Sequence, residues 1–309
     1  MDRIDELETW LAIVDGGSLA EAARKLGRSP PAVTRALAAL EERVGTRLLD
    51  RTTRRAIPTD AGLRLAEQAR RLLGELDDAL HEAAEDAAPT GLLRVSAPRV
   101  FGARHVAPVA FGFLDAFPRV RVDLSLDDRV VDLLDERIDV GVRVGELPPS
   151  TIVARRVGYV SRVVLASPSY LARRGEPASP EELVDHEVVH FASMGGEPTR
   201  WRFRDDTRVS VVPRLVVDHA ELAVEAAREG RGLVTAFCYQ VEDELEAGHL
   251  RRVLVSHEPP PVPVHLVRVG GRFAPRRVRA FVDFAAPALE TVLARVGAVV
   301  ARTGGIPRA

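Results

Sequence analysis

The sequence predicts an α/β protein of several domains, with a helical N-terminal part and a longer C-terminal part in which strands and helices alternate. Up to about residue 88, apolar residues recur at helical spacing between capping motifs. From about Leu92 to Gly297, short apolar or alternating runs are followed by amphipathic segments, as in sheets covered by helices. A chain of 309 residues is long enough for two or three domains with cores of their own.

The composition excludes several classes of protein. Hydrophobic residues make up 46% and charged residues 28% of the chain, and the net charge is −2, which is ordinary for a soluble protein. The single cysteine, Cys238, excludes an intrachain disulfide and a zinc cluster built on cysteines. No apolar run approaches the length of a membrane span, and the charged N-terminus is not that of a signal peptide. We therefore expect a cytoplasmic protein with no membrane partner.

Two helices are predicted before residue 28. The first covers Ile4–Val14, where apolar residues fall on one face. The second follows a capping box, in which the Ser18 hydroxyl caps the helix and the Glu21 side chain reaches back to Ser18. Gly27 ends this short helix, because glycine accepts the left-handed conformation found at helix ends.

A third helix begins only two residues later, within "LGRSPPAVTRALAALEERVG" (residues 26–45). Ser29 is a good N-cap, and Pro30 and Pro31 are tolerated because the first backbone N–H groups of a helix have no partner within it. The short connection forces the two helices to cross steeply, which predicts a helix-turn-helix. The inner face of the third helix is formed by Val33, Leu37 and Leu40.

The outer face of the third helix carries Thr34 and Arg35. In a helix-turn-helix, the N-terminal residues of the second helix meet base edges in the major groove. Arginine pairs with guanine, and the threonine methyl packs on a thymine methyl. Nine basic and three acidic residues between Arg24 and Arg55 leave a local excess of six positive charges, which alone favours nucleic acid only weakly. Double-stranded DNA is the expected partner.

The segment "LLDRTTRRAIPTDAG" predicts a β-wing over residues 48–57, with Arg51, Arg54 and Arg55 able to reach phosphates or a narrow minor groove. A long helix then runs to about Ala88, and its apolar residues recur at alternating steps of three and four, as in a coiled coil. A helix packed on its own domain would show a similar pattern. We favour a dimerising helix, with contacts through Ala69, Leu73, Leu76 and Leu80.

Residues 1–88 resemble the N-terminal module of LysR-type transcriptional regulators, through "GGSLAEAARKLGRSPPAVTRALAALEERVGTRLLDRTTRR" followed by "TDAG". The resemblance implies a winged helix-turn-helix over 1–58, a linker helix over 59–88, a two-lobed effector domain like a periplasmic binding protein over 91–297, and a flexible tail over 298–309. It also implies a homodimer or homotetramer, with RNA polymerase as a further partner. The implied DNA-binding residues are Ser29, Pro30, Pro31, Thr34, Arg35, Arg51, Thr53, Arg54 and Arg55.

This chain departs from many members of that family at Pro30, where they carry a glutamine that reads bases. Proline cannot replace those hydrogen bonds, so readout must depend more on Thr34, Arg35 and the wing.

In the C-terminal part, the resemblance implies a first lobe of about 91–163 and 267–297 and a second lobe of about 164–266. The two crossover strands are expected near Val163–Ala166 and His265–Val269. Ligands of such folds lie between the lobes, at strand C-termini and helix N-termini. The residues implied to line this cleft are Ser96, Pro98, Arg99, Val100, Ser125, Gly145, Thr151, Ser193, Asp218 and Phe237.

Many relatives carry Ser or Thr where this chain has Val100, and that hydroxyl holds a carboxylate. Val100 therefore argues against a simple carboxylate effector, although Arg99 could compensate. The free N–H groups after Ser96 favour an anionic or polar group, and Phe237 adds an apolar wall. We expect a small organic effector that is aromatic or otherwise amphipathic, and no cofactor or metal.

Two alternatives remain. "HEVVH", from His186 to His190, matches the metalloprotease motif, but its valines favour a strand, on which the two histidines are too far apart to share one zinc ion. Cys238 has apolar neighbours and is expected to be a buried small residue rather than a redox sensor. The second candidate function is a two-lobed sensor that signals mainly to a protein partner. An enzyme ranks third.

Overall fold

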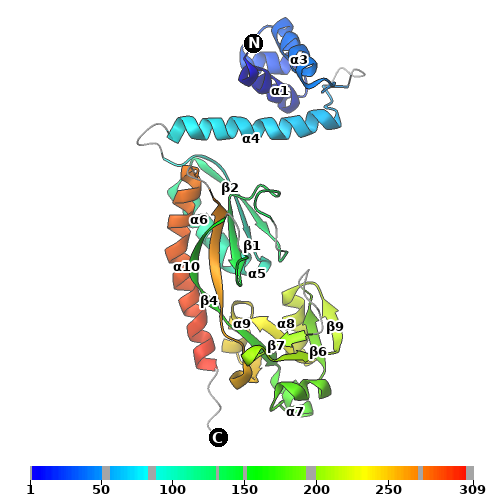
Figure 1. Ribbon diagram of the computed structural model, residues 1–309, viewed down its shortest axis with the longest axis vertical. Coiled ribbons are helices and arrows are strands. Elements are labelled where there is room, and N and C mark those ends of the chain that lie inside the picture. Colours follow the sequence, from blue (N-terminus) through cyan, green and yellow to red (C-terminus); the bar gives the residue numbers. More distant parts are fainter. Residues whose placement is uncertain are drawn as a thin grey trace. The chain divides into compact units, whose positions relative to one another are not determined.

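The structure is a computed structural model that describes residues 2–50, 56–82, 88–129, 132–148, 152–192, 200–270 and 274–303. The chain forms two compact units, Met1–Ala87 and Ala88–Ala309. The first unit is helical (Figure 1), and its helices are α1 (Arg3–Gly16), α2 (Leu19–Leu26), α3 (Pro30–Val44) and α4 (Asp60–Glu82).

The core of the first unit is built around α1, whose Trp10 and Ile13 are fully buried together with Val33 of α3. The predicted wing has an antiparallel base, in which the Asp50 N–H donates to the Ile57 carbonyl at 2.9 Å. Residues 51–55 of the predicted wing lie outside the described residues.

The ends of α2 and α3 confirm most of the predicted signals. The Ser18 hydroxyl accepts from the Glu21 N–H at 3.1 Å, and Gly27 adopts φ 63°. The Glu21 carboxylate, however, pairs with Arg24, so the second half of the predicted capping box is wrong. Ser29 is the N-cap of α3, yet its hydroxyl makes no capping bond. The first free N–H of this proline-led helix, that of Ala32, bonds to the Ser29 carbonyl instead.

The second unit begins with a five-stranded sheet in the order β2-β1-β3-β12-β4, which is the first lobe. Strand β1 runs parallel to β2 and β3, and β12 lies antiparallel between β3 and β4. The strands are β1 (Gly91–Ala97), β2 (Val120–Leu126), β3 (Val140–Val144), β4 (Ile152–Val160) and β12 (Val262–Val269). The accompanying helices are α5 (Arg99–Phe101), the π-helix η1 (Gly102–Val106), α6 (Ala107–Ala116) and α10 (Arg276–Thr303).

The second lobe has an antiparallel sheet in the order β10-β5-β11, a parallel pair β6-β9 and a hairpin β7-β8. Its strands are β5 (Arg162–Ala166), β6 (Val188–Phe191), β7 (Arg200–Arg202), β8 (Arg208–Ser210), β9 (Pro213–Val217), β10 (Val234–Phe237) and β11 (Arg251–Val253). Its helices are α7 (Pro168–Arg174), α8 (Ala220–Arg228), α9 (Cys238–Glu246) and the 3-10 turns η2 (Pro180–Asp185), η3 (Arg204–Asp206) and η4 (Val255–His257).

The crossings between the lobes differ from the prediction. The chain leaves the first lobe at Ser161, between β4 and β5, and it is back in the first sheet from Val262 onward. Val163–Ala166 therefore lies inside the second lobe's sheet, and His265–Val269 inside the first. An apolar run looks alike in a sheet strand and in a crossover strand, so the sequence pattern did not separate them.

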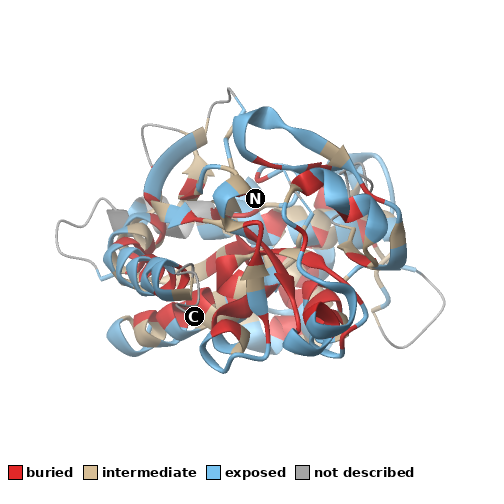
Figure 2. Ribbon diagram, turned by 90° about the horizontal axis from the view of Figure 1, so that it is seen from below, coloured by how far each residue is buried: buried red, intermediate tan, exposed pale blue. Residues whose placement is uncertain are grey.

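Helix α10 continues to Thr303, so the prediction of a flexible tail is wrong for residues 298–303, and residues 304–309 lie outside the described part. Contrary to the expectation from the sequence, α10 is long and apolar enough to cross a membrane. Its apolar stripe, however, from Val278 to Val300, is buried against the rest of the unit, as the red inward faces in Figure 2 illustrate. Helix α10 is a core helix of the second unit.

Candidate nucleic-acid interface and ligand site

The N-terminal end of α3 is open to solvent. The five predicted DNA-binding residues that the structure describes are all exposed, and they are Ser29, Pro30, Pro31, Thr34 and Arg35. Behind them Val33 and Leu40 are buried and Leu37 is half-buried, so the predicted inner face is confirmed. The predicted wing residues Arg51, Thr53, Arg54 and Arg55 lie outside the described residues.

The exposed side chains differ in what they offer to a base. The Thr34 hydroxyl donates to the Pro30 carbonyl at 3.0 Å, so Thr34 offers its methyl group and an acceptor oxygen but no free donor. Arg35 makes no hydrogen bond or ion pair with another described residue, so its whole guanidinium group is available. The tip of α3 thus combines apolar surface with one free cation.

Part of the basic patch is neutralised inside the unit. Arg28 pairs with Asp5, and its other Nη donates to the Thr9 hydroxyl at 3.0 Å. Arg43 binds both oxygens of the Glu6 carboxylate at 3.1 Å, and Glu6 is only 2% exposed. Counting charges along the sequence missed these acids, because they come from α1. The local excess of six positive charges therefore overstates what α2 and α3 present to DNA.

Helix α4 divides into two parts. Ala66 and Ala69 are buried, so the prediction that Ala69 contacts a partner chain is wrong. For this part of α4, the alternative of a helix packed on its own domain holds. Leu73 and Leu76 are half-buried, and Leu80 is 64% exposed. These three leucines keep apolar surface that the first unit does not cover.

In the first lobe, the predicted ligand residues gather at the carboxyl ends of β1, β2 and β3. Ser96 lies opposite Ser125 in the parallel register of β1 and β2, and Gly145 follows β3. Pro98 is the N-cap of α5, and the exposed Arg99 is its first residue.

Two of the predicted ligand residues in the first lobe are buried. Ser96 and Val100 are only 2% and 5% exposed. A ligand reaches them only if the surrounding structure opens. Thr151 lies outside the described residues.

In the second lobe, Phe237 ends β10 and Asp218 follows β9, while Ser193 lies outside the described residues. The Phe237 ring stacks on Tyr239, with centroids 5.7 Å apart, and the Arg162 guanidinium lies 4.6 Å above its centroid. A hydrogen bond with His219 at 2.8 Å lowers the pKa of the Asp218 carboxyl.

Three residues at this edge were missed by the sequence reasoning: Arg162, Tyr239 and His190. The buried Nδ1 atom of His190 has no hydrogen-bond partner among the described residues, and burial lowers the pKa of the imidazole. Arg162 could have been found as the one charged residue that precedes the apolar run of β5. No short pattern marks the other two.

Aromatic and ionic contacts join the two lobes. Phe101 of the first lobe meets Tyr239 of α9 edge to face, with ring centroids 5.1 Å apart. His105 Nε2 is buried without a hydrogen bond and lies 3.8 Å from Glu242 Oε1 of α9. Burial lowers the pKa of His105 to about 4 and raises the pKa of Glu242. Buried residues of both lobes form one apolar core.

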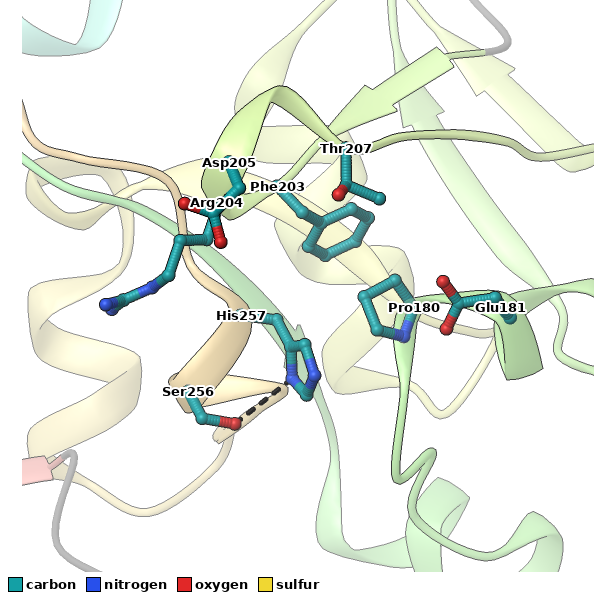
Figure 3. A pocket seen from close by; sticks show the side chains of 8 residues that line it. All are labelled: Pro180, Glu181, Phe203, Arg204, Asp205, Thr207, Ser256 and His257. Atoms are coloured by element: carbon teal, nitrogen blue, oxygen red, sulfur yellow. Dashed lines mark hydrogen bonds between the residues drawn. The ribbon is translucent and has the colours of Figure 1, made fainter.

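A separate cavity of about 260 Å³ lies in the second lobe (Figure 3), and none of the predicted ligand residues that the structure describes lines it. The Ser256 hydroxyl and His257 Nδ1 are 3.1 Å apart and bond to each other, and Arg204 extends away from Phe203 and Pro180. Its polar side chains are thus not directed together at a common point, and we do not assign a ligand to it.

The "HEVVH" segment forms a strand, as predicted, because Val188–Phe191 is β6. His186 ends η2 and lies 3.0 Å from the Tyr170 hydroxyl. The Glu187 carboxylate accepts from that hydroxyl at 2.9 Å and from Arg174 Nε at 3.0 Å, which lowers its pKa. The glutamate that a zinc hydrolase would use as a base is therefore engaged in a structural network.

Residues 4–63 match the family model described as bacterial regulatory helix-turn-helix protein, lysR family, and residues 86–290 match the LysR substrate binding domain. The chain belongs to the LysR family of transcriptional regulators. Members of this family combine a DNA-binding helix-turn-helix with an effector-binding domain, so this LysR protein is a ligand-responsive regulator of transcription, and the predicted fold class is confirmed.

Individual relatives agree with this assignment. The LysR protein is 34% identical to an HTH-type transcriptional regulator of Xanthomonas campestris, over 89% of this chain and 82% of the relative. It is 32% identical to the regulator PtxR of Pseudomonas aeruginosa, over 91% of each chain. The solved structure of CrgA, a LysR-type regulator from Neisseria meningitidis, matches with a TM-score of 0.60 and 29% identity, over 92% of this chain and 98% of that one.

Proposed function

We propose that this LysR protein reads its operator through the exposed end of α3, with Thr34 and Arg35 at base edges and the wing arginines at the DNA backbone. The observation that carries the proposal is the free Arg35, one turn into α3, beside arginines that are paired within the unit. An unpaired guanidinium at this end of a recognition helix is suited to bidentate contact with guanine.

Replacing Arg35 tests this assignment. We expect Arg35→Ala to weaken operator binding by about 1–3 kcal/mol and to relax sequence choice. The matched control is Arg24→Ala on α2, which removes an equally exposed cation that is paired with Glu21 and should change the operator-to-random-DNA affinity ratio little. Affinities for operator and random DNA are measured by fluorescence anisotropy at several salt concentrations. An unchanged ratio for Arg35→Ala would refute the recognition-helix assignment.

We further propose a homodimer or homotetramer that acts in the cytoplasm, is not an enzyme, and contacts RNA polymerase when bound to DNA. Leu73, Leu76 and Leu80 of α4 are the candidates for contact with a second copy, because their surface is left uncovered by the first unit. Two heads joined in this way could reach successive major grooves about 34–36 Å apart on one face of the DNA. Sedimentation of the full chain at micromolar concentration as a monomer would contradict this.

The proposed effector is a small aromatic or amphipathic molecule that binds between the facing strand ends of the two lobes. Arg99 and Asp218 supply charges of both signs at these ends, and Phe237 with Arg162 above its ring supplies a flat apolar surface. A ligand changes the arrangement of the lobes only by binding one arrangement more tightly than another.

A thermal-shift screen of metabolites identifies the effector, and variants then locate it. We expect Phe237→Ala to reduce the ligand-induced shift of Tm, while Phe111→Ala, a control on exposed α6, leaves it unchanged. An equal shift in both variants places the ligand elsewhere. If the wild-type protein does not recognise operator DNA but still shows a ligand-induced shift of Tm, the alternative function is favoured, a sensor for a protein partner.

A further inference from the structure

The C-terminal half of α10 spans both lobes. On the first lobe, Leu293 lies against β4 at Gly158, where a Cβ atom would come within 2.8 Å of Leu293 Cδ1. Gly158 is three residues before Ser161, the outward crossing. The helix is therefore seated directly on the strand that leads out of the first lobe.

One buried arginine ties the end of α10 to the second lobe. Arg252 of β11 donates from Nη1 to the Val300 carbonyl at 2.5 Å. Its Nε and Nη2 donate to the Glu258 carboxylate at 3.0 and 2.5 Å, and the two side chains are only 5% and 10% exposed. Glu258 directly precedes Pro259–Pro261, the return crossing. A single guanidinium thus joins β11, the return crossing and the last turns of α10.

Helix α9 adds a second line of contacts. Glu242 lies within 3.8 Å of Arg295 of α10 and of His105 and Arg104 of the first lobe. One turn further on, Arg302 pairs with Glu246 at 2.9 Å. None of the residues named in these contacts is a candidate ligand residue, although α9 directly follows Phe237 and η1 directly follows α5.

We propose that the last two turns of α10, Val296–Thr303, are a brace that sets the angle between the lobes through Arg252. A buried charge is stable only while its partners stay in place. Rotation at the crossings would pull Val300 away from the guanidinium, which Glu258 holds in the second lobe, so the brace opposes it. A ligand that changes the lobe angle must bind the new arrangement tightly enough to overcome this opposition.

The brace does not depend on the identity of the effector or on DNA binding, because it acts in the free protein. The experiment therefore uses ligand-free protein. Spin labels on cysteines introduced at the exposed positions Asp115 in the first lobe and Val184 in the second report the interlobe distance by double electron–electron resonance, in a background with Cys238→Ala.

Two variants loosen the brace. One chain ends after Arg295, and its matched control ends after Thr303. The other is the full-length Arg252→Lys variant, which keeps the charge but lacks the planar fork that serves Glu258 and Val300 together. We expect a shifted mean and a broader distance distribution in both variants and an unchanged distribution in the control.

Arg252→Lys is decisive if the shortened chain does not fold, which its unfolding curve reveals. A distribution for Arg252→Lys that matches the wild type in mean and width overturns the proposal. Failure of the Arg35 or Phe237 experiments leaves it standing, since neither residue takes part in the brace.

Discussion

The end of α3 that we propose reads DNA and the crossings between the lobes are built in opposite ways. At α3, the five described residues that we propose for DNA binding lie between Ser29 and Arg35, and each of the five is exposed. At the crossings, Arg252, Glu258 and Val300 come from separate segments and are withdrawn from water. Exposed side chains without a partner contribute little to the stability of the fold, whereas buried charge pairs affect it directly. Variants in the two regions should therefore fail differently, the first in recognition and the second in stability.

The largest effect is expected at the crossings. Arg252→Met leaves the buried Glu258 carboxylate without its partner, and we expect a loss of about 3–5 kcal/mol in the free energy of unfolding of the second unit. The double variant Arg252→Met/Glu258→Leu removes both charges and should recover much of this loss. Urea unfolding of the full chain, followed by circular dichroism, measures both. Equal stability of the single and double variants would show that the pair is not coupled.

A smaller effect concerns pH. The pKa of His105 is about 4 in the folded protein, well below the ordinary value near 6.5, mainly because of burial. As pH falls below 6.5, His105 becomes protonated in the unfolded chain but stays neutral in the folded chain, so the free energy of unfolding decreases. Between pH 7 and 5 this costs about 2 kcal/mol, partly offset by Glu242, whose raised pKa acts in the opposite direction.

His105→Gln is the control for this effect. Its unfolding free energy should fall less than that of the wild type between pH 7 and 5, with Glu242, Arg104, Arg295 and Asp243 unchanged around it. Parallel pH profiles for the two proteins would mean that His105 does not titrate in the way its burial predicts.

The smallest effect tests the apolar tip of α3. Because the Thr34 hydroxyl is engaged by Pro30, only its methyl group remains to meet a thymine methyl. Replacing one thymine of the operator by deoxyuridine should weaken wild-type binding by about 0.8 kcal/mol at the position that Thr34 reads. The Thr34→Ser variant, which keeps the hydroxyl, should be indifferent to the same replacement. A wild-type protein that tolerates deoxyuridine throughout the operator would contradict this contact.

The two regions also differ in how far the sequence predicted them. The cap at Ser18, the stop at Gly27 and the prolines at the start of α3 are short-range signals, so the helix-turn-helix and the family could be predicted. The pairing of Arg28 and Arg43 with acids of α1 depends on how the helices pack, which no local pattern encodes.

In the second unit, the alternation of strands and helices was predictable, but the crossings and the end of α10 were not. The contact of Arg252 with Val300 spans 48 residues. Val299 and Val300 are buried by this long-range packing, although the resemblance implied a flexible tail from residue 298 onward. Of the ligand-site candidates, Ser125, Asp218 and Phe237 were implied by the family resemblance, whereas Arg162 and His190 are recognised only when β5 and β6 lie in one lobe.

The two crossings differ in stiffness. The outward one passes through a single residue, Ser161, whose carbonyl accepts from the Cys238 N–H at 2.9 Å. The return passes through Pro259, Pro260 and Pro261, whose rings fix φ near −65° and leave three consecutive residues with little torsional freedom. We therefore expect a change of lobe angle to alter the backbone dihedral angles of Ser161 more than those of the three prolines.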